Sequence, residues 1–552
     1  MKILIVGGVA GGASAAARLR RLSEKDEIIM FEKGEYISFA NCGLPYYIGD
    51  VIQNRNKLLV QTVEGMGRRY HLDIRNWTEI IKINREKKSV IAKKVMTGEE
   101  YEEFYDVLIL SPGSKPVWPN IPGINEAKSV YTLRNVPDTD RIKEKVDLEK
   151  PEKAVVIGGG FIGIEMAENL TERGIQVTLI EMGNQVMAPI DLEMAQIVHT
   201  HMREKGIQLI LEDGVSSIEK SGRVIRLTSG REVETDMILL AIGVQPESSI
   251  AKDAGLELGI RDTIKVNEHL QTSDPSIYAV GDVIEVKDYI NGKETYVPLA
   301  WPANRQGRLV ADHIHGKESV YHGTLGTSIA KVFELTVSST GNNEKTLKRL
   351  GIPYEVVHVA PSSHAGYYPG ASQLQLKLIF DKDTGKIYGA QAVGKEGVDK
   401  RIDVIATAIK GGLTVLDLPD IEIAYAPPYS SAKDPVNMLG YSATNIMEGM
   451  VSTVQWHEID ELVEKGGYLI DVRSPQEVAK GAIKGSVNIP VDELRDRLSE
   501  IPTDRELYLT CQVGMRGYLA TRILEGNGIK VKNLDGGYNL YSKAFPEKIN
   551  RD

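Results

Sequence analysis

A glycine-rich turn that joins a short apolar strand to a helix occurs twice in this chain, and the repeat restricts the possible folds. In the first copy, the apolar run 2–6 precedes the turn Gly7–Gly12 (GGVAGG) and an alanine-rich helical stretch, and a second apolar run ends at Glu32. This pattern predicts a strand–helix–strand unit whose backbone N–H groups bind a pyrophosphate while the acid binds a ribose hydroxyl. Val9 replaces the middle glycine of the G-x-G-x-x-G pattern, so this copy is imperfect.

The second copy matches the pattern fully. The strand pattern 154–157 is followed by Gly158-x-Gly160-x-x-Gly163, and the strand pattern 176–180 ends at Glu181. A hydride-transfer enzyme that uses one nicotinamide needs only one such unit. Two units therefore predict two dinucleotides, most simply a flavin and a nicotinamide.

Each unit is followed by an apolar strand pattern that ends in a glycine turn. These are 107–110 before Ser111-Pro112-Gly113, and 237–241 before Ile242-Gly243. A third such segment, 272–282, ends in Gly281-Asp282. The region 325–445 has strand alternation and helical stretches, the pattern lapses around 444–452, and a short α/β pattern continues to the end.

Composition limits the class of protein. A chain of 552 residues exceeds one core and predicts three to five domains. The net charge of −10 argues against a nucleic-acid partner, and we find no apolar run of the 18 residues that a membrane span needs. The first apolar run is too short for a signal peptide.

The cysteine and histidine content predicts no metal site. Only two cysteines occur, Cys42 and Cys511, which excludes a disulfide framework and a thiolate zinc cluster and fits a reducing, cytoplasmic location. The histidine pairs 199/201 and 313/315 are spaced i,i+2 and diverge on a helix.

Together, the two turns and the segment Tyr278–Asp282 resemble those of the flavoprotein disulfide reductases that bind two dinucleotides. The resemblance covers about residues 1–445. It implies an α/β fold with two Rossmann-like domains, one for FAD and one for NAD(P)H, and an α+β dimerisation domain that makes a homodimer. It also implies that Asp282 bonds the flavin ribitol. The implied cofactor-binding residues are Gly7, Gly8, Ala10, Gly11, Gly12, Glu32, Lys33, Ser111, Pro112, Gly113, Gly158, Gly160, Phe161, Gly163, Glu181, Gly243, Gly281, Asp282 and Ala300.

The single cysteine of the first domain excludes a dithiol relay within this site. Cys42 lies in SFANCGLPY, which is similar to the single-cysteine branch of the family, the coenzyme A disulfide reductases. One thiolate attacks a disulfide and retains half of the substrate as a mixed disulfide. Reduced flavin then releases that half. This chemistry requires a site that lowers the thiol pKa. The alternative interpretation is a buried, inert cysteine.

Other members of the single-cysteine branch act on peroxide or oxygen and have a histidine in the first turn. Val9 and Ala10 occupy these positions here, which argues against a peroxidase or an NADH oxidase. In the coenzyme A branch two tyrosines of the partner subunit act at the thiol, and Tyr367 and Tyr425 match them by position. A phenol could protonate the leaving thiolate. Tyr368 could replace Tyr367, or these tyrosines could simply pack at the dimer interface.

Coenzyme A would be the bound substrate and product, and its phosphorylated nucleotide end needs cations. Arg18 and Arg21 share a helix face, and Arg68-Arg69 is a further basic pair, although a charged helix face is often only solvated. We expect the coenzyme A site to contain Ser14, Arg18, Arg21, Ser38, Asn41 and Arg69.

The last hundred residues resemble a rhodanese, a sulfurtransferase that carries sulfane sulfur as a cysteine persulfide. The resemblance rests on the segment 471–490 and on Cys511-Gln-Val-Gly-Met-Arg516, with Ala482 where the family often has histidine. Successive backbone N–H groups after the strand, helped by Arg516, would bind the persulfide anion. Cysteine phosphatases need five residues between cysteine and arginine, and here there are four. A degenerate, protein-binding rhodanese fold is the alternative.

These observations predict an FAD-dependent enzyme in which NAD(P)H reduces coenzyme A disulfide, coenzyme A persulfide or polysulfide, fused to a rhodanese domain. Glu181 favours NADH, because a carboxylate repels a 2′-phosphate. Open alternatives are a primary polysulfide or persulfide reductase, or a rhodanese domain that serves only as a sensor or docking module. The predicted domains are FAD-binding (1–112 and 245–322), NAD(P)H-binding (113–244), dimerisation (323–445), linker (446–452) and rhodanese (453–552).

Overall fold

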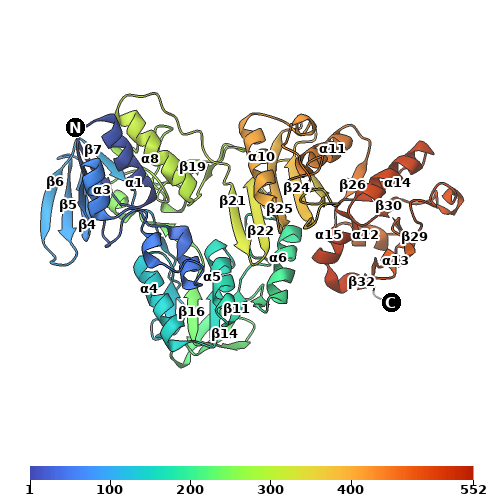
Figure 1. Cartoon of the computed structure of the whole chain (residues 1–552), viewed down its shortest axis with the longest axis horizontal. Helices are drawn as coiled ribbons and strands as arrows, with labels where there is room; N and C mark the ends of the chain where they lie inside the picture. Colours follow the sequence, from blue (N-terminus) through green and yellow to red (C-terminus); the bar gives the residue numbers. More distant parts are fainter. Residues whose placement is uncertain (551–552) are drawn as a thin grey trace. The chain divides into compact units, whose positions relative to one another are not determined.

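The computed structural model describes residues 1–550, and the chain forms two compact units (Figure 1). The first unit contains Met1–Gly183 and Gly206–Gly326, and the second contains Asn184–Lys205 and the chain from Thr327 on. The chain therefore leaves the first unit, contributes one short segment to the second, and returns.

The first unit begins with a five-stranded parallel sheet, which we call the first-turn sheet. Its strand order is β18-β7-β1-β2-β3, and Val6 pairs with both Phe31 and Leu110. The first glycine turn, Glu32 and Ser111 therefore follow neighbouring strands at the same edge, where loops of a parallel sheet form ligand sites. The strands are β1 (Lys2–Val6), β2 (Glu27–Phe31), β3 (Asp73–Arg75), β7 (Val107–Leu110) and β18 (Ile277–Ala279).

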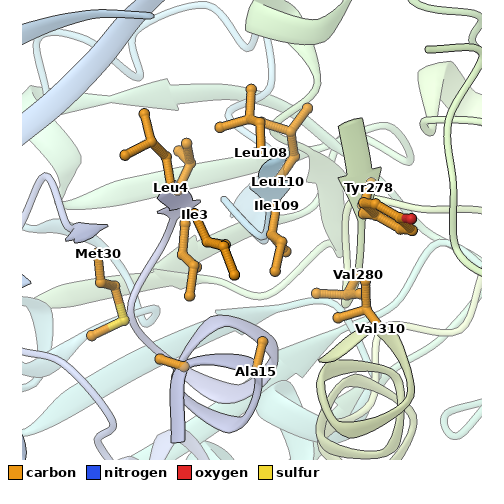
Figure 2. Close-up of a cluster of buried hydrophobic side chains, with 14 of the residues drawn as sticks. Ile3, Leu4, Ala15, Met30, Leu108, Ile109, Leu110, Tyr278, Val280 and Val310 are labelled. Carbon is orange, nitrogen blue, oxygen red and sulfur yellow. The ribbon is translucent and has the colours of Figure 1, made fainter. Parts of the chain in front are cut away.

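Helices α1 (Ala10–Leu22) and α8 (Ala300–Ile314) pack together beside this sheet. The core contains the apolar strand residues Ile3, Leu4 and Ile109 and the helical Ala15 (Figure 2). Gly307 permits the close approach of the helices, because an added Cβ would lie 2.3 Å from the carbonyl oxygen of Gly11. Further elements here are α2 (Leu44–Ile48), α3 (Val63–Tyr70), β4 (Thr78–Asn84), β5 (Ser89–Lys94) and β6 (Glu100–Phe104).

The second glycine turn also follows a parallel sheet, with strand order β12-β11-β10-β16-β9. Ile157 pairs with both Ile180 and Leu240, so the second turn, Glu181 and Ala241 again lie at one edge. The elements are β9 (Val130–Thr132), α4 (Val136–Glu144), β10 (Lys153–Ile157), α5 (Phe161–Glu172), β11 (Gln176–Ile180), β12 (Gln208–Ile210) and β16 (Met237–Leu240), with an antiparallel set β13 (Val215–Glu219), β14 (Val224–Leu227) and β15 (Glu232–Glu234).

The second unit contains an antiparallel sheet of order β21-β22-β25-β24-β23, which we call the dimerisation sheet. Its central strands β24 and β25 are buried along their whole length because helices cover the sheet. Helix α6, contributed by residues 192–204, packs on β25. The elements are β21 (Ser328–Val332), β22 (Leu335–Gly341), α9 (Glu344–Leu350), β23 (Glu355–Val359), β24 (Leu374–Phe380), β25 (Ile387–Gly394), α10 (Val398–Lys410) and α11 (Pro435–Met447).

The C-terminal module of the second unit is a parallel sheet of order β26-β31-β30-β27-β29. Helix α11 ends at Met447 and β26 begins at Ser452, so only four residues join the module to the preceding helix. The elements are β26 (Ser452–Val454), α12 (Ile459–Glu464), β27 (Tyr468–Asp471), α13 (Pro475–Val478), β29 (Val487–Asn488), β30 (Leu507–Thr510), α14 (Met515–Gly526), β31 (Lys532–Leu534) and α15 (Gly537–Ala544).

The predicted α/β architecture, with two dinucleotide-type sheets and a C-terminal α/β module, is confirmed. Among residues 1–550, no helix has the length and apolar character that would let it cross a bilayer.

Candidate active sites

The first glycine turn has the shape of an anion-binding site. Gly7 has a φ of +97°, and a Cβ on Gly12 would lie 1.9 Å from the carbonyl oxygen of Gly7. Helix α1 begins at Ala10, and no side chain within residues 1–550 caps its N-terminus. Its first amides are therefore available to a bound pyrophosphate.

Glu32 lies at the end of β2 and is bonded to the turn. Its carboxylate accepts hydrogen bonds from the N–H groups of Gly8 and Gly34, both at 2.9 Å. The predicted residue Lys33 is exposed and forms an ion pair with Glu247 at 2.7 Å. Ser111 follows β7 and donates its N–H to the carbonyl of Val6 at 2.7 Å. Pro112 and Gly113 follow Ser111 in the loop after β7, at the same edge of the sheet.

The segment that ends in Gly281-Asp282 follows β18 at the same edge. Gly281 has a φ of +81° and donates its N–H to Gln306 at 2.7 Å. The Asp282 carboxylate accepts a hydrogen bond from the Ser114 hydroxyl at 3.0 Å. Ala300 is the first residue of α8, whose N-terminus no side chain caps. The first turn, Glu32, Asp282 and the start of α8 thus form one polar edge that fits the diphosphate and sugar portions of FAD.

The second glycine turn repeats this geometry. Gly158 has a φ of +106°, and a Cβ on Gly163 would lie 2.0 Å from the Gly158 carbonyl oxygen. The space above Gly160 is open, so a ligand can approach its backbone closely. The Glu181 carboxylate accepts hydrogen bonds from the N–H groups of Gly159 and Gly183, both at 2.7 Å. Phe161 begins α5 and Gly243, with φ +105°, follows β16, so both predicted residues lie beside this turn. The site fits a second dinucleotide.

Cys42 lies in a short 3₁₀ turn, Asn41–Gly43, just before α2. Its segment is bonded to the first glycine turn, because Ser38, at a φ of +44°, donates its N–H to the carbonyl of Gly8 at 2.9 Å. Cys42 itself is exposed. The Oδ1 atom of Asn41 is buried and has no hydrogen-bond partner within residues 1–550, so it is free to bind a ligand donor.

The prediction that the site lowers the pKa of Cys42 is wrong. Surrounding protein atoms and the carboxylates of Glu165 and Asp282 raise the pKa of this thiol. Burial and Glu168 in turn raise the pKa of Glu165 to about 7, although a hydrogen bond from Tyr46 opposes the shift. Glu165 and Tyr46 were missed in the sequence. Glu165 lies two residues after Gly163 in α5, and its proximity to Cys42 depends on the packing of α2 on α5.

The predicted coenzyme A residues are not equally free to bind a phosphate. The Arg18 guanidinium is paired with Asp312 of α8 at 2.5 Å, and the Ser14 hydroxyl donates to Asn304 at 2.6 Å. Arg21 on α1 and the basic pair 68–69 at the end of α3 are exposed. Net positive charge is therefore more available from Arg21 and Arg69 than from Arg18.

The two predicted tyrosines of the second unit lie next to each other. The Oη atoms of Tyr367 and Tyr425 are 3.0 Å apart, and the side chains are 77% and 48% exposed. The hydrogen bond with Tyr425 raises the pKa of Tyr367. Buried Arg401 links the segment before Tyr367 to the segment after Tyr425. Its guanidinium donates to the carbonyl of Ser363 and to the carboxylate of Asp434, both at 2.9 Å. The alternative Tyr368 is also exposed.

Cys511 directly follows β30 and opens the loop into α14. The thiol Sγ accepts a hydrogen bond from the Gly514 N–H at 3.0 Å, and the residue is 1% exposed. The Arg516 guanidinium is held by both carboxylate oxygens of Glu477 at 2.7 Å, which lowers the pKa of that carboxyl group to about 2. Arg516 therefore approaches the thiol as one half of an ion pair, a detail absent from the sequence pattern.

A second arginine supports this loop and was not predicted. Buried Arg473 forms a bidentate pair with Asp471, with a closest contact of 2.6 Å. Its guanidinium also stacks 3.8 Å from the ring centre of Tyr538 and donates to the side chain of Gln512 at 3.4 Å. The segment Asp471-Val-Arg473 carried this signal in the sequence.

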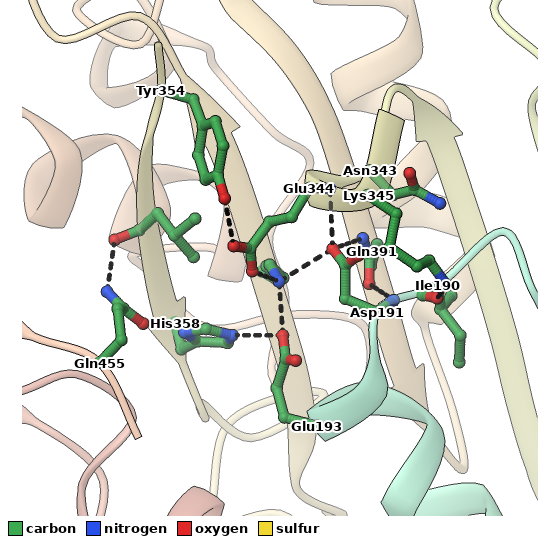
Figure 3. A network of polar contacts seen from close by, with 12 residues as sticks. Ile190, Asp191, Glu193, Asn343, Glu344, Lys345, Tyr354, His358, Gln391 and Gln455 are labelled. Atoms are coloured by element: carbon green, nitrogen blue, oxygen red, sulfur yellow. Dashed lines mark hydrogen bonds and ion pairs between the residues drawn. The ribbon is translucent and has the colours of Figure 1, made fainter. Parts of the chain in front are cut away.

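Three acidic residues converge in the second unit around a buried ammonium group. Asp191, Glu193 and Glu344 offer oxygens within 4.8 Å of one another, the arrangement of a possible cation site. Lys377 is fully buried and its Nζ atom lies 2.9 Å from Asp191, 2.5 Å from Glu193 and 2.5 Å from Glu344. Figure 3 shows the three acids around this position. The cation that balances these carboxylates is thus part of the chain.

Comparison with known proteins assigns most of the chain to families. The sequence model of the pyridine nucleotide-disulphide oxidoreductases matches residues 1–307, and the model of their dimerisation domain matches 327–435. A rhodanese-like domain matches residues 455–544.

The chain is also similar to characterised and solved relatives. It is 39% identical to a coenzyme A disulfide reductase of Staphylococcus epidermidis over 443 residues, which cover 80% of this chain and 99% of that protein. The structure of reduced Bacillus anthracis CoADR-RHD superposes with a TM-score of 0.98 at 68% identity and 99% coverage of both chains. An NAD-dependent persulfide reductase from A. fulgidus superposes with a TM-score of 0.92 at 38% identity, covering 98% of this chain and 100% of that one.

Proposed function

We propose that this chain, which belongs to the pyridine nucleotide-disulphide oxidoreductases and carries a rhodanese-like domain, is an NAD(P)H-dependent reductase of coenzyme A disulfide and related sulfane-sulfur compounds. One observation carries the proposal. The only cysteine of the first unit is bonded through Ser38 to the first glycine turn and lies near Glu165 of the helix that follows the second turn. A cytoplasmic location is part of the proposal, supported by two free thiols.

The first turn, Glu32 and Asp282 would bind FAD, and the second turn with Glu181 would bind NAD(P)H. When bound, the flavin supplies a carrier that accepts hydride from the nicotinamide and passes an electron pair to the thiol site. The backbone amides of the two glycine turns would hold the two diphosphates, and the bond from Ser38 to Gly8 holds the Cys42 segment beside the first turn. Glu181 disfavours the 2′-phosphate of NADPH, so NADH is the expected donor.

Cys42 supplies the nucleophile. Its thiolate attacks one sulfur of the disulfide, the S–S bond breaks, and one coenzyme A thiolate leaves and takes up a proton. The remaining Cys42–coenzyme A disulfide accepts two electrons, which release the second thiolate and regenerate the Cys42 thiolate. NAD(P)H and one proton are consumed for two coenzyme A thiols.

Tyr425 and Tyr367 would supply the proton to the leaving thiolate from the partner subunit of a homodimer. Their support is the 3.0 Å contact between two exposed phenols in a region that matches a dimerisation domain. The exposed Arg21 and Arg69 would bind the phosphates of coenzyme A, with Ser14, Ser38 and Asn41 nearer its pantetheine arm and Arg18 positioned by Asp312.

The proposed domain division follows the predicted one, with residues 1–112 and 245–322 binding FAD and 113–244 binding NAD(P)H. Residues 323–445 would form the dimerisation domain and 453–552 the rhodanese domain. Segment 184–205 is the exception to this proposed division, because it belongs to the second compact unit, where Asp191 and Glu193 pair with Lys377.

Sulfane-sulfur reduction is the second candidate function, and the intact loop around Cys511 favours it. The hydrogen bond from Gly514 and the neighbouring Arg516 would stabilise a persulfide anion. In this form of the proposal, Cys511 accepts or delivers sulfane sulfur and Cys42 reduces it.

Steady-state turnover of coenzyme A disulfide, coenzyme A persulfide and polysulfide, measured side by side, tests both candidates. Cys42→Ser should lose reduction of all three substrates while it retains FAD that NADH reduces. Cys511→Ser should keep coenzyme A disulfide reduction and lose turnover of sulfane sulfur. Full disulfide turnover by Cys42→Ser would refute the central step, and unchanged sulfane-sulfur turnover by Cys511→Ser would refute the second function.

A further inference from the structure

A fully buried histidine of the dimerisation sheet is bonded to the C-terminal module. His358 of β23 donates its backbone N–H to Asp535 at 3.0 Å, and its Nδ1 atom lies 2.6 Å from the other carboxylate oxygen of Asp535. Its Nε2 atom lies 3.2 Å from Glu193 of α6 (Figure 3). A buried imidazole between two carboxylates is a specific, directional contact, because each ring nitrogen has one partner.

The surroundings favour the charged imidazolium. Burial lowers the pKa of His358, but Asp535 and Glu193 more than offset this effect and raise it to about 9. Lys377 of β24, which contacts the same oxygen of Glu193, opposes the shift. At neutral pH, His358 and Asp535 therefore form an ion pair that neither solvent nor salt screens strongly.

Asp535 leads directly into the segment that supports the Cys511 loop. Gly536 and Gly537, with φ of +70° and +60°, turn the chain from Asp535 into α15. The turn is tight, since a Cβ on Gly537 would lie 2.4 Å from the carbonyl oxygen of Cys511.

The first turn of α15 then binds the backbone of the thiol loop. The N–H of Tyr538 donates to the carbonyl of Cys511 at 2.7 Å, and the N–H of Asn539 donates to that of Gln512 at 3.0 Å. The Asn539 side chain also donates to Gln375 of the dimerisation sheet at 3.4 Å. Segment 535–539 thus supports the loop after Cys511, and the dimerisation sheet contacts this segment at both of its ends, residues 535 and 539.

We propose that His358 is a positioning residue for sulfur transfer at Cys511, and that it acts by fixing Asp535 and thereby segment 535–539. The dimerisation sheet is then a structural part of the sulfurtransferase site. The inference rests on the proposed sulfane-sulfur function of Cys511. A displacement of the loop by about 1 Å is sufficient to cost roughly 10²-fold in rate, because the thiolate must meet its substrate in line.

Full-length holoenzyme tests this with thiosulfate as donor and cyanide as acceptor. The Cys511 thiolate attacks the outer sulfur of thiosulfate, sulfite leaves as the S–S bond breaks, and cyanide removes the sulfur as thiocyanate. For Asp535→Ala we expect kcat to fall roughly 10- to 100-fold with KM for thiosulfate within about twofold. Asp535→Asn and His358→Gln, which keep one hydrogen bond, should lie between it and the parent. His199→Gln, another buried histidine of this unit, should match the parent.

Coenzyme A disulfide reduction at Cys42 should be unchanged in every variant. Parental kcat in Asp535→Ala, or a rise in KM alone, would overturn the proposal. If Asp535→Ala gives no folded holoenzyme, the two conservative variants decide in its place, and parental kcat in both would overturn it.

Failure of the sulfur-transfer function itself is a separate result. If the parent shows no transfer that depends on Cys511, iodoacetamide alkylation of Cys511 in a Cys42→Ser background becomes the readout. We then expect at least a tenfold faster alkylation in Asp535→Ala, because Sγ is buried behind the supported loop. An unchanged rate would overturn the positioning role.

Discussion

Removal of the buried ammonium of Lys377 should strongly destabilise the second unit. The Nζ atom is the shared cation for three carboxylates at 2.5–2.9 Å, and Lys377→Met would leave them buried and facing one another. Breaking one buried ion pair by deleting a partner costs about 3–5 kcal/mol. The population of opened molecules should therefore rise roughly 10²- to 10⁴-fold.

Thiol labelling measures this quantity directly. In a Cys42→Ser background Cys511 is the only thiol of the chain, and it is 1% exposed. Its labelling rate tracks the opened population when closing is faster than labelling. Lys348→Met is the matched control, because Lys348 also pairs with Glu344, at 3.3 Å, but is 60% exposed. That exposed pair should contribute at most about 1 kcal/mol.

The pH dependence of the stability of the second unit should have the opposite sign in Lys377→Met. In the parent, Lys377 lowers the pKa of Glu344 to about 2 and also lowers that of Glu193, so their stabilisation is present above about pH 4.5 and is lost as pH falls toward 2. Without the lysine, burial raises the pKa of Glu344 above that of the unfolded chain, whereas His358, 3.2 Å from Glu193, still lowers the pKa of Glu193. The folded variant then binds more protons at Glu344, and its stability falls as pH rises from about 5 to 7, by up to ~1.4 kcal/mol per pH unit for that carboxylate. Labelling within tenfold of the control, or a parental pH trend, would refute this account.

Three further predictions concern the first unit and the tyrosines. Gly12→Ala should fold without flavin, because its Cβ would lie 1.9 Å from the Gly7 carbonyl oxygen; a stoichiometric flavin absorbance would contradict this. Glu181→Ala should lower the NADH-to-NADPH ratio of kcat/KM by about tenfold, or ~1.4 kcal/mol, and an unchanged ratio would remove the role of the carboxylate. Tyr425→Phe should lower kcat for coenzyme A disulfide by roughly 10²–10⁴ at most, whereas Tyr429→Phe, which is also exposed, should not.

Local pattern predicted the parts of the molecule that depend on local backbone geometry. The two glycine turns, the acids at positions 32 and 181 and the loop after Cys511 all lie where the strand–turn–helix pattern places them, since a turn without Cβ atoms can be read from glycines alone. The raised pKa of Cys42 could not be predicted from the sequence, because it depends on burial of the thiol and on Glu165, and packing determines both. The position of segment 184–205 in the second unit could not be predicted either, because its acidic residues pair with Lys377, which is far away in the sequence.

The origin of helix α6 has a consequence for synthesis of the chain on the ribosome. Glu193 and Lys377 are 184 residues apart, so at roughly 5–20 residues per second the helix waits about 10–40 s for its cation to be made. During that interval its buried side, which includes Met194 and Val198, has no sheet to cover it. The first unit, which ends at Gly326, can fold before most of the second unit has been synthesised. Between translation of residue 205 and completion of β25 at residue 394, the nascent chain therefore exposes this apolar side and would benefit from a chaperone, and slow codons there should lower the yield of folded enzyme.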